Sequence, residues 1–383
     1  MSADKSSNGQ HGKTQADTPG GKVRKILITG GAGFIGSNLA ERVLADPSAR
    51  VRIFDNLSRT GVAHNLAWLQ GRGRGKRLEF VHGDITDAAA VRNAVQDADE
   101  IYHLAAQVAV TTSVDQPRLD FDINVCGTLN VLEAARCSGR LPFLLFTSTN
   151  KVYGSLPGVP VVTKDTRYAA RDIDFRGVME NEPLDFHSPY GCSKGAADQY
   201  VRDYARIYNL PTVVFRMSCI AGPRQFGTED QGWVAHFLYS VLEGKPITIY
   251  GDGFQVRDVL HVSDLVDAMQ KVRMSDRSAG EIYNLGGGPE RAISVVEMLQ
   301  AIARQTGIRP ILHYKDVRPG DQPLYISNTA KLAAHTGWRP HFSIIDILQS
   351  IHGFWRNNRA FLAEQRKEVG PDSAREMVVE EVA

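Results

Sequence analysis

The stretch Thr29-Gly30-Gly31-Ala32-Gly33-Phe34-Ile35-Gly36 decides the fold that we expect for this chain. It follows an apolar run at 25–29 and opens a helical pattern that extends to residue 44. Gly30 permits a tight turn, Gly33 lets a diphosphate approach the backbone, and Gly36 lets the helix and the strand pack closely. The N–H groups at the start of the helix then face a pyrophosphate. A glycine turn in this setting predicts a dinucleotide-binding unit.

Strand and helix patterns alternate after this turn, with further strands expected at 51–55, 79–84, 100–104, 143–147 and 212–216. This alternation predicts an α/β fold, namely a Rossmann doubly wound parallel sheet with a smaller C-terminal α/β lobe. We expect a disordered tail at 1–22, a Rossmann domain at 23–222 with a lid-like insert at 155–185, a substrate-binding lobe at 223–360, and a charged tail at 361–383. The lobe is expected to return partly to the main sheet through strands near 259–262 and 281–285.

Composition excludes several classes of protein. The 383 residues are 43% hydrophobic and 23% charged with a net charge of +1, which is an ordinary globular balance. Neither a nucleic acid nor a membrane is expected as a partner. The 4 cysteines form no C-x-x-C pair and have no histidine cluster beside them, so we expect free thiols and no metal site. The chain shows no signal peptide or membrane-spanning run, which favours a cytoplasmic protein.

An acidic residue after the second expected strand indicates which dinucleotide binds. Asp55 lies nineteen residues beyond Gly36, where a carboxylate accepts hydrogen bonds from the ribose hydroxyls of NAD and repels the 2′-phosphate of NADP. Arg59 weakens this preference, because a nearby arginine can accept that phosphate. Asp84 and Ile85 close the third strand, where they either flank the adenine or form a plain turn. We therefore expect NAD as the cofactor.

A tyrosine and a lysine, Tyr190 and Lys194, lie four residues apart at the start of an expected helix. That spacing places both side chains on one face, where the ammonium is expected to lower the pKa of the phenol towards neutrality. Such a phenol can remove a proton from a sugar hydroxyl while hydride leaves the same carbon. Thr149, at the end of the fifth strand, offers a hydroxyl to the reacting oxygen. Asn124 is expected to brace the central strands from the long helix near 120–137.

These motifs together resemble the extended short-chain dehydrogenases/reductases, in the group of nucleotide-sugar epimerases and dehydratases. The resemblance covers about residues 23–354 and includes Leu104-Ala105-Ala106, Val152-Tyr153-Gly154, Arg216, the segment 257–262 and the segment 318–321. It implies a homodimer that binds a nucleotide-diphosphate sugar. The cofactor-binding residues that it implies are Gly30, Gly33, Phe34, Ile35, Gly36, Asp55, Asn56, Ser58, Arg59, Asp84, Ile85, Leu104, Ala105, Ala106, Gln107, Asn124, Tyr190 and Lys194.

Two residues after Thr149 separate the activities within this group. The 4,6-dehydratases carry an Asp and a Glu there, which serve as acid and base for elimination, whereas this chain has Asn150 and Lys151. An amide and an ammonium cannot replace that pair, so an epimerase is favoured. The closer resemblance is to 2-epimerases of the CDP-paratose/CDP-tyvelose type, which implies C2 epimerisation of a CDP-sugar through a transient ketone. A UDP-sugar 4-epimerase and a non-catalytic dinucleotide sensor remain as alternatives.

Substrate contacts are expected mainly from two arginines. Arg257 and Arg318 are candidates for the diphosphate, because guanidinium groups suit bidentate phosphate contacts. Cys219 stands where the relatives have more polar or aromatic residues, in a stretch that contacts nucleotide and sugar. The full set of expected substrate-binding residues is Thr111, Thr149, Asn150, Lys151, Cys219, Arg224, Gln231, Arg257, Arg318 and Asp321.

Overall fold

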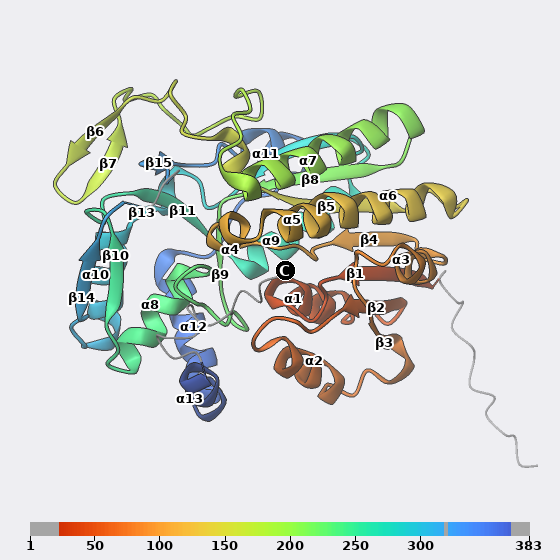
Figure 1. Cartoon of the computed structure of the whole chain (residues 1–383), viewed down its shortest axis with the longest axis horizontal. Coiled ribbons are helices and arrows are strands. Elements are labelled where there is room, and N and C mark those ends of the chain that lie inside the picture. Colours follow the sequence, from red (N-terminus) through yellow and green to blue (C-terminus); the bar gives the residue numbers. More distant parts are fainter. Residues whose placement is uncertain (1–22, 318–320, 369–383) are drawn as a thin grey trace, which may run out of the picture.

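The main sheet confirms the α/β class expected from the sequence. The computed structural model describes residues 23–317 and 321–368, so the predicted tail at 1–22 lies outside the described residues. Within them, a 7-stranded parallel sheet has the order β12-β8-β5-β4-β1-β2-β3 (Figure 1). Its strands in chain order are β1 (Arg24–Thr29), β2 (Ala49–Asp55), β3 (Leu78–His82), β4 (Glu100–His103), β5 (Phe143–Thr149), β8 (Thr212–Met217) and β12 (Glu281–Leu285).

Helices cover both faces of this sheet because successive strand residues point to opposite sides. On β5, Leu144 faces one buried cluster and Leu145 faces the other. One face is covered by α1 (Phe34–Val43), α2 (Val62–Gly71), α9 (Val262–Met274) and α11 (Ala330–Thr336). The other is covered by α3 (Ala88–Val95), α6 (Gly127–Cys137) and α7 (Ser188–Tyr208), next to α4 (Val110–Asp115) and α5 (Pro117–Phe121). Among the described residues, no helix combines the length and the apolar character that crossing a bilayer requires.

Only one of the two late strands rejoins the main sheet. β12 pairs with β8 as expected, but the prediction for 259–262 was wrong. The first three residues of that segment belong to β11 (Val256–His261), whose neighbours in a second sheet are β9 (Cys219–Ala221), β13 (Ala292–Ser294) and β15 (Leu324–Tyr325). Around it lie β10 (Ile247–Tyr250), β14 (Leu312–Lys315), α8 (Trp233–Leu242), α10 (Val295–Thr306) and α12 (Ile344–Asn357). An apolar run alone does not encode which strand it will pair with.

The C-terminal boundary also differs from the expectation. Helix α13 (Arg359–Glu368) continues past residue 360, and Leu362 is only 2% exposed. The tail predicted from 361 therefore begins with packed residues, and 369–383 lie outside the described residues.

The insert forms a hairpin of β6 (Val161–Lys164) and β7 (Arg167–Ala170). Thr166 Oγ1 donates to Glu297 at 2.8 Å and the N–H of Tyr168 donates to the carbonyl of Phe254 at 2.9 Å. These contacts fasten the hairpin to the β11 region, beside β13 in Figure 1. No residue of the insert lines the cleft at the glycine turn that is described below, and its role as a lid over the nucleotide sugar stays a prediction.

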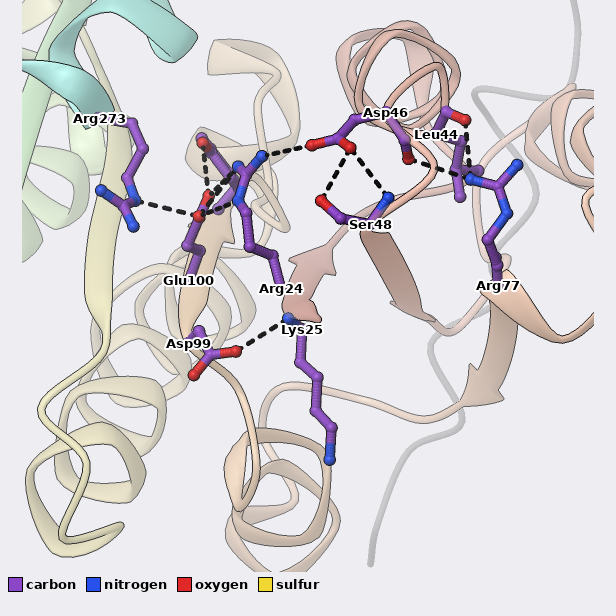
Figure 2. Close-up of polar contacts among 10 residues, drawn as sticks. Arg24, Lys25, Leu44, Asp46, Ser48, Arg77, Asp99, Glu100 and Arg273 are labelled. Atoms are coloured by element: carbon purple, nitrogen blue, oxygen red, sulfur yellow. Dashed lines mark hydrogen bonds and ion pairs between the residues drawn. The ribbon is translucent and has the colours of Figure 1, made fainter. Parts of the chain in front are cut away.

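A buried carboxylate, that of Glu100, joins β1, β4 and α9 at the end of the main sheet where β1 and β4 begin (Figure 2). The side chain of Glu100 is 0% exposed. It accepts hydrogen bonds from Arg24 Nε at 3.0 Å and from the phenol of Tyr102 at 3.3 Å, and it pairs with Arg273 Nε at 3.1 Å. Burying a charge is costly unless it is paired, so these two arginines hold the edge together.

We expect the double variant R24M/R273M to lower the free energy of unfolding by about 3–5 kcal/mol, because it leaves the Glu100 carboxylate buried without a cation. Urea unfolding measures this change. The matched control is R136M, since Arg136 pairs with Glu133 on the surface, where solvent screens the ion pair and its loss should change the stability little. A double variant as stable as R136M would contradict the structural role given to Glu100.

Candidate active site

The carboxyl ends of β1, β2 and β4 open into a cleft of about 440 Å³. Parallel α/β sheets bind ligands at this edge. Most residues that the sequence predicted for cofactor binding line the cleft, namely Gly30, Gly33, Phe34, Ile35, Gly36, Asp55, Asn56, Ser58, Arg59, Asp84, Ile85, Leu104, Ala105 and Ala106. Gln107, Asn124, Tyr190 and Lys194 do not.

The glycine turn forms a cradle that side chains would fill. Gly30 has a φ of +67°, and a Cβ there would lie 2.7 Å from the amide nitrogen of Ala105. A Cβ on Gly36 would lie 2.4 Å from the carbonyl oxygen of Gly30. Helix α1 begins directly behind the turn, so its unpaired N–H groups face the cleft. The cradle has the shape and polarity that a diphosphate requires.

Two acidic side chains flank the cradle. The carboxylate of Asp55 accepts hydrogen bonds from the N–H of Ala32 at 3.1 Å and the N–H of Leu57 at 2.9 Å. Burial raises its pKa, although these two bonds favour the charged form. Each carboxylate oxygen keeps a second acceptor site, so Asp55 can still accept from a ribose hydroxyl. Asp84 is held by Asn56 at 2.8 Å and by Thr86 at 2.7 Å.

Asn124 does not line the cleft, and its side chain braces the loop after β4 against the neighbouring helices rather than the central strands that the sequence predicted. It lies in a π-helical turn at Asp122–Cys126, between α5 and α6. Its Oδ1 accepts from the N–H of Gln107 at 3.0 Å, and its Nδ2 donates to the Gln107 carbonyl, to Asp120 and to Ser193. The Gln107 amide in turn bonds to Ala109. Both side chains are therefore occupied within the protein.

Thr149, Tyr190 and Lys194 come together at the end of β5 and the start of α7. Thr149 lies close enough to Tyr190 to lower the pKa of its phenol, while Thr149 Oγ1 donates to Asn150 Oδ1 at 3.4 Å and accepts from the N–H of Lys151 at 3.2 Å. The Lys194 side chain is 3% exposed in total, and its ammonium lies 4.0 Å from the ring centroid of Phe146. No hydrogen bond to this ammonium is found among the described residues. Arg59, from the cleft wall, interacts electrostatically with Tyr190.

The expectation that Lys194 lowers the pKa of Tyr190 towards neutrality is not met in this structure. Burial raises the pKa of Tyr190 to about 12, while Thr149 and Arg59 act in the opposite direction. Burial also lowers the pKa of Lys194 to about 7, although Asp198 and Asp120 favour its charged form. Both residues lie on α7, as the spacing predicted, but the spacing carried no information about how deeply the two groups are buried.

A second polar group lies where β5 approaches β11. Asp321 Oδ1 accepts from Arg257 at 2.7 Å and lies 3.4 Å from the ammonium of Lys151. Asn150 is turned towards the neighbouring Gln322, to which its Nδ2 donates at 3.1 Å. The side chains of Asn150 and Lys151 thus each bind one residue of the segment 321–322.

Two expected substrate residues, Arg224 and Gln231, lie apart from this polar group. The guanidinium of Arg224 stacks 3.0 Å from the ring centroid of Trp68 on α2, and Gln231 bonds to Arg59. Both line the cleft at the glycine turn, and their role in binding the substrate stays a prediction. Cys219 lies beside that group and accepts a hydrogen bond from Trp233 Nε1 at 3.2 Å. Thr111 lies in α4, and Arg318 is outside the described residues.

Sequence reasoning missed the buried polar residues behind the site. Asp198 binds Arg216 through two hydrogen bonds of 2.9 Å, and Arg216 donates to the Tyr153 phenol at 3.0 Å. Asp120, from α5, lies beside Lys194. Asp198 could have been suspected, since it follows Lys194 by four residues, but no sequence signal marks Asp120.

Comparisons with known proteins agree with this geometry. The family described as GDP-mannose 4,6 dehydratase matches residues 27–351. The chain belongs to this family. Its membership confirms the family resemblance found in the sequence and the expectation that the protein is an enzyme.

Individual members of the family differ in activity. CDP-paratose 2-epimerase of Salmonella typhi is 43% identical over 336 residues, which are 86% of this chain and 98% of that protein. UDP-glucose 4-epimerase of Mycolicibacterium smegmatis is 33% identical over 334 residues, 87% of this chain and 99% of that protein. The dTDP-glucose 4,6-dehydratase DesIV of Streptomyces venezuelae, solved with NAD and TYD bound, has a TM-score of 0.76 at 30% identity and covers 89% of this chain and 99% of its own.

Proposed function

We propose that this enzyme is an NAD-dependent nucleotide-sugar epimerase that inverts C2 of a CDP-sugar of the paratose/tyvelose type. The observation that carries the proposal is the turn after β5. It presents Thr149 to Tyr190, while Asn150 and Lys151 occupy the two positions where dehydratases of this family carry carboxylates. The 43% identity to a CDP-paratose 2-epimerase, against 33% to a UDP-glucose 4-epimerase, supports the finer assignment.

The cleft residues fit the proposed cofactor. The cradle of Gly30, Gly33 and Gly36 would hold the diphosphate, and Asp55 would accept from the adenosine ribose. The Lys194 ammonium, with no hydrogen bond to the described residues, would donate to the nicotinamide ribose. Bound NAD+ supplies the acceptor that takes hydride from the sugar carbon and returns it.

The chain's own residues would manage the proton. Tyr190 removes the proton of the sugar hydroxyl as the ketone forms, and Thr149 donates to the same oxygen. When the ketone is presented by its other face, Tyr190 returns the proton. Thr149 and Arg59 both favour the phenolate that this step needs. Because general bases work best with a pKa near the operating pH, the high pKa of Tyr190 must fall when the site is filled.

Elimination of water is disfavoured by the charges around Asp321. This carboxylate is the acid that pairs with Lys151. Burial raises its pKa, but the cations Arg257 and Lys151 lower it by more, so that the carboxyl group is held in its charged form. A carboxylate held in its charged form is a poor general acid near neutral pH. Arg257, with Arg318, would instead bind the substrate diphosphate within a nucleotide-sugar-binding lobe at 223–360.

The reaction can be tested by incubating the purified enzyme with CDP- and UDP-hexoses in deuterated water and following the products by NMR. We expect C2 inversion of a CDP-sugar with no deuterium at C2, because the hydride returns from the cofactor. Denatured enzyme analysed by mass spectrometry is expected to release NAD. Inversion at C4 of a UDP-sugar would overturn the C2 assignment in favour of a 4-epimerase.

We propose a homodimer and a cytoplasmic location as well. Exposed apolar side chains gather on the adjoining helices α4, α5 and α7, namely Val114, Leu119, Phe121, Tyr200, Ile207 and Tyr208. A second copy of the chain would cover them, and light scattering should give twice the chain mass of 42.1 kDa.

The cysteines at 126, 137, 192 and 219 are unpaired, which is typical of a reducing compartment.

A further inference from the structure

Asp120 is a buried carboxylate beside the active site that the proposed reaction does not use. It lies on α5, which packs against α7, and it is 1% exposed. Its Oδ1 accepts from Asn124 at 3.0 Å, whereas its Oδ2 forms no hydrogen bond with any described residue. No ion pair within 4.0 Å reaches it in the described part of the chain. A carboxylate that is buried and half-satisfied normally has a function or a charged partner nearby.

The groups that surround Lys194 leave Asp120 as its compensating charge. On β5 the ammonium faces the ring of Phe146, and on β4 it faces His103, whose pKa burial lowers to about 3, so that this ring is neutral. On α7 the neighbours are Tyr190 and Asp198, and the charge of Asp198 is already neutralised by Arg216. Burial raises the pKa of Asp120, whereas Ser193, Lys194 and Asn124 favour its charged form, and Lys194 is the one cation among these neighbours in the described part of the chain.

We infer that Asp120 is the counter-ion of Lys194, a positioning residue that keeps the lysine charged inside the protein. The inference rests on the proposed function for the role of Lys194 in turnover, but not for the electrostatic pairing itself. The two groups form no direct ion pair in this structure, so the interaction acts through space, where a low dielectric strengthens it.

The negative charge of Asp120 acts on the pKa values of both Lys194 and Tyr190. Asp120 favours the protonated lysine and disfavours the Tyr190 phenolate. Removing its charge therefore lowers the pKa of both groups. The ammonium is then lost at a lower pH, and the phenolate forms at a lower pH. In the pH–rate profile, the acidic limb follows the phenol of Tyr190 and the basic limb follows the ammonium of Lys194. Both limbs should move to lower pH together, whereas a loss of packing alone would reduce the rate without moving them.

The test uses D120N, which keeps the shape and removes the charge, in enzyme purified with its cofactor and labelled with [13Cε]lysine. The Lys194 signal is assigned with K194R and titrated by NMR between pH 5 and pH 10. We expect its midpoint to fall by about one pH unit in D120N. D122N is the matched control, because Asp122 is two residues away and pairs with Arg118 on the surface. It should leave the midpoint unchanged.

D120E supplies a second variant that keeps the charge, and it should restore a midpoint near that of the wild type even if D120N is unstable. An unchanged midpoint in a folded D120N, or a D120E midpoint that falls with D120N, would overturn the inference. A different result would contradict the proposed function, namely that the wild-type enzyme turns over no nucleotide sugar. The NMR midpoint remains informative in that case, because it does not depend on turnover.

Discussion

Replacing Tyr190 with Phe should reduce epimerisation by about 10²–10⁴-fold, the contribution that a positioned acid–base group typically makes. The substitution removes the phenol that lies beside Thr149, while the aromatic ring that packs in the site is retained. Thr149 keeps its bond to the N–H of Lys151, so the turn should hold its shape. Product formation is measured by NMR or chromatography at saturating substrate.

The matched control is Y314F, which makes the same change at an exposed position on β14. It should retain wild-type activity, and both variants should unfold at the wild-type temperature. If Y190F keeps full activity, the proposed mechanism is wrong. A non-catalytic dinucleotide sensor would then become the better account of the chain.

Replacing Gly36 with Ala should weaken NAD binding at least tenfold and lower the free energy of unfolding by about 1–3 kcal/mol. The new Cβ would lie 2.4 Å from the Gly30 carbonyl oxygen and 2.6 Å from Gly31 Cα, which are backbone atoms that cannot rotate away. Helix α1 would have to move off β1, and its N-terminus would leave the diphosphate cradle. Calorimetric titration with NAD and urea unfolding measure the two effects.

G353A is the control for this substitution. Gly353 lies inside helix α12, where a Cβ would meet nothing within 4 Å. Alanine is the better helix former by about 1 kcal/mol, so this variant should be slightly more stable and should bind NAD normally. Equal NAD affinity in G36A and the wild type would contradict the location of the cradle.

Local sequence patterns predicted the parts of the protein that depend on neighbouring residues. The glycine turn, the alternating strands and the spacing of Tyr190 and Lys194 are all encoded within a few residues. The sequence therefore predicted the main sheet, the cleft wall and the helix that carries Tyr190. The predictions that failed required knowledge of distant segments, such as the pairing of 259–262 within the second sheet and the packing of α13.

The glycine turn and Asp55 show what the sequence by itself determined, because a sharp turn and a strand end are short-range geometry. Only the tertiary structure decided the electrostatics. It stacked Arg224 on Trp68, tied Lys151 to Asp321, and placed Asp120 beside Lys194 from another helix. It also set the pKa values of Tyr190 and Lys194, because burial and charged neighbours depend on residues that lie far apart in the chain.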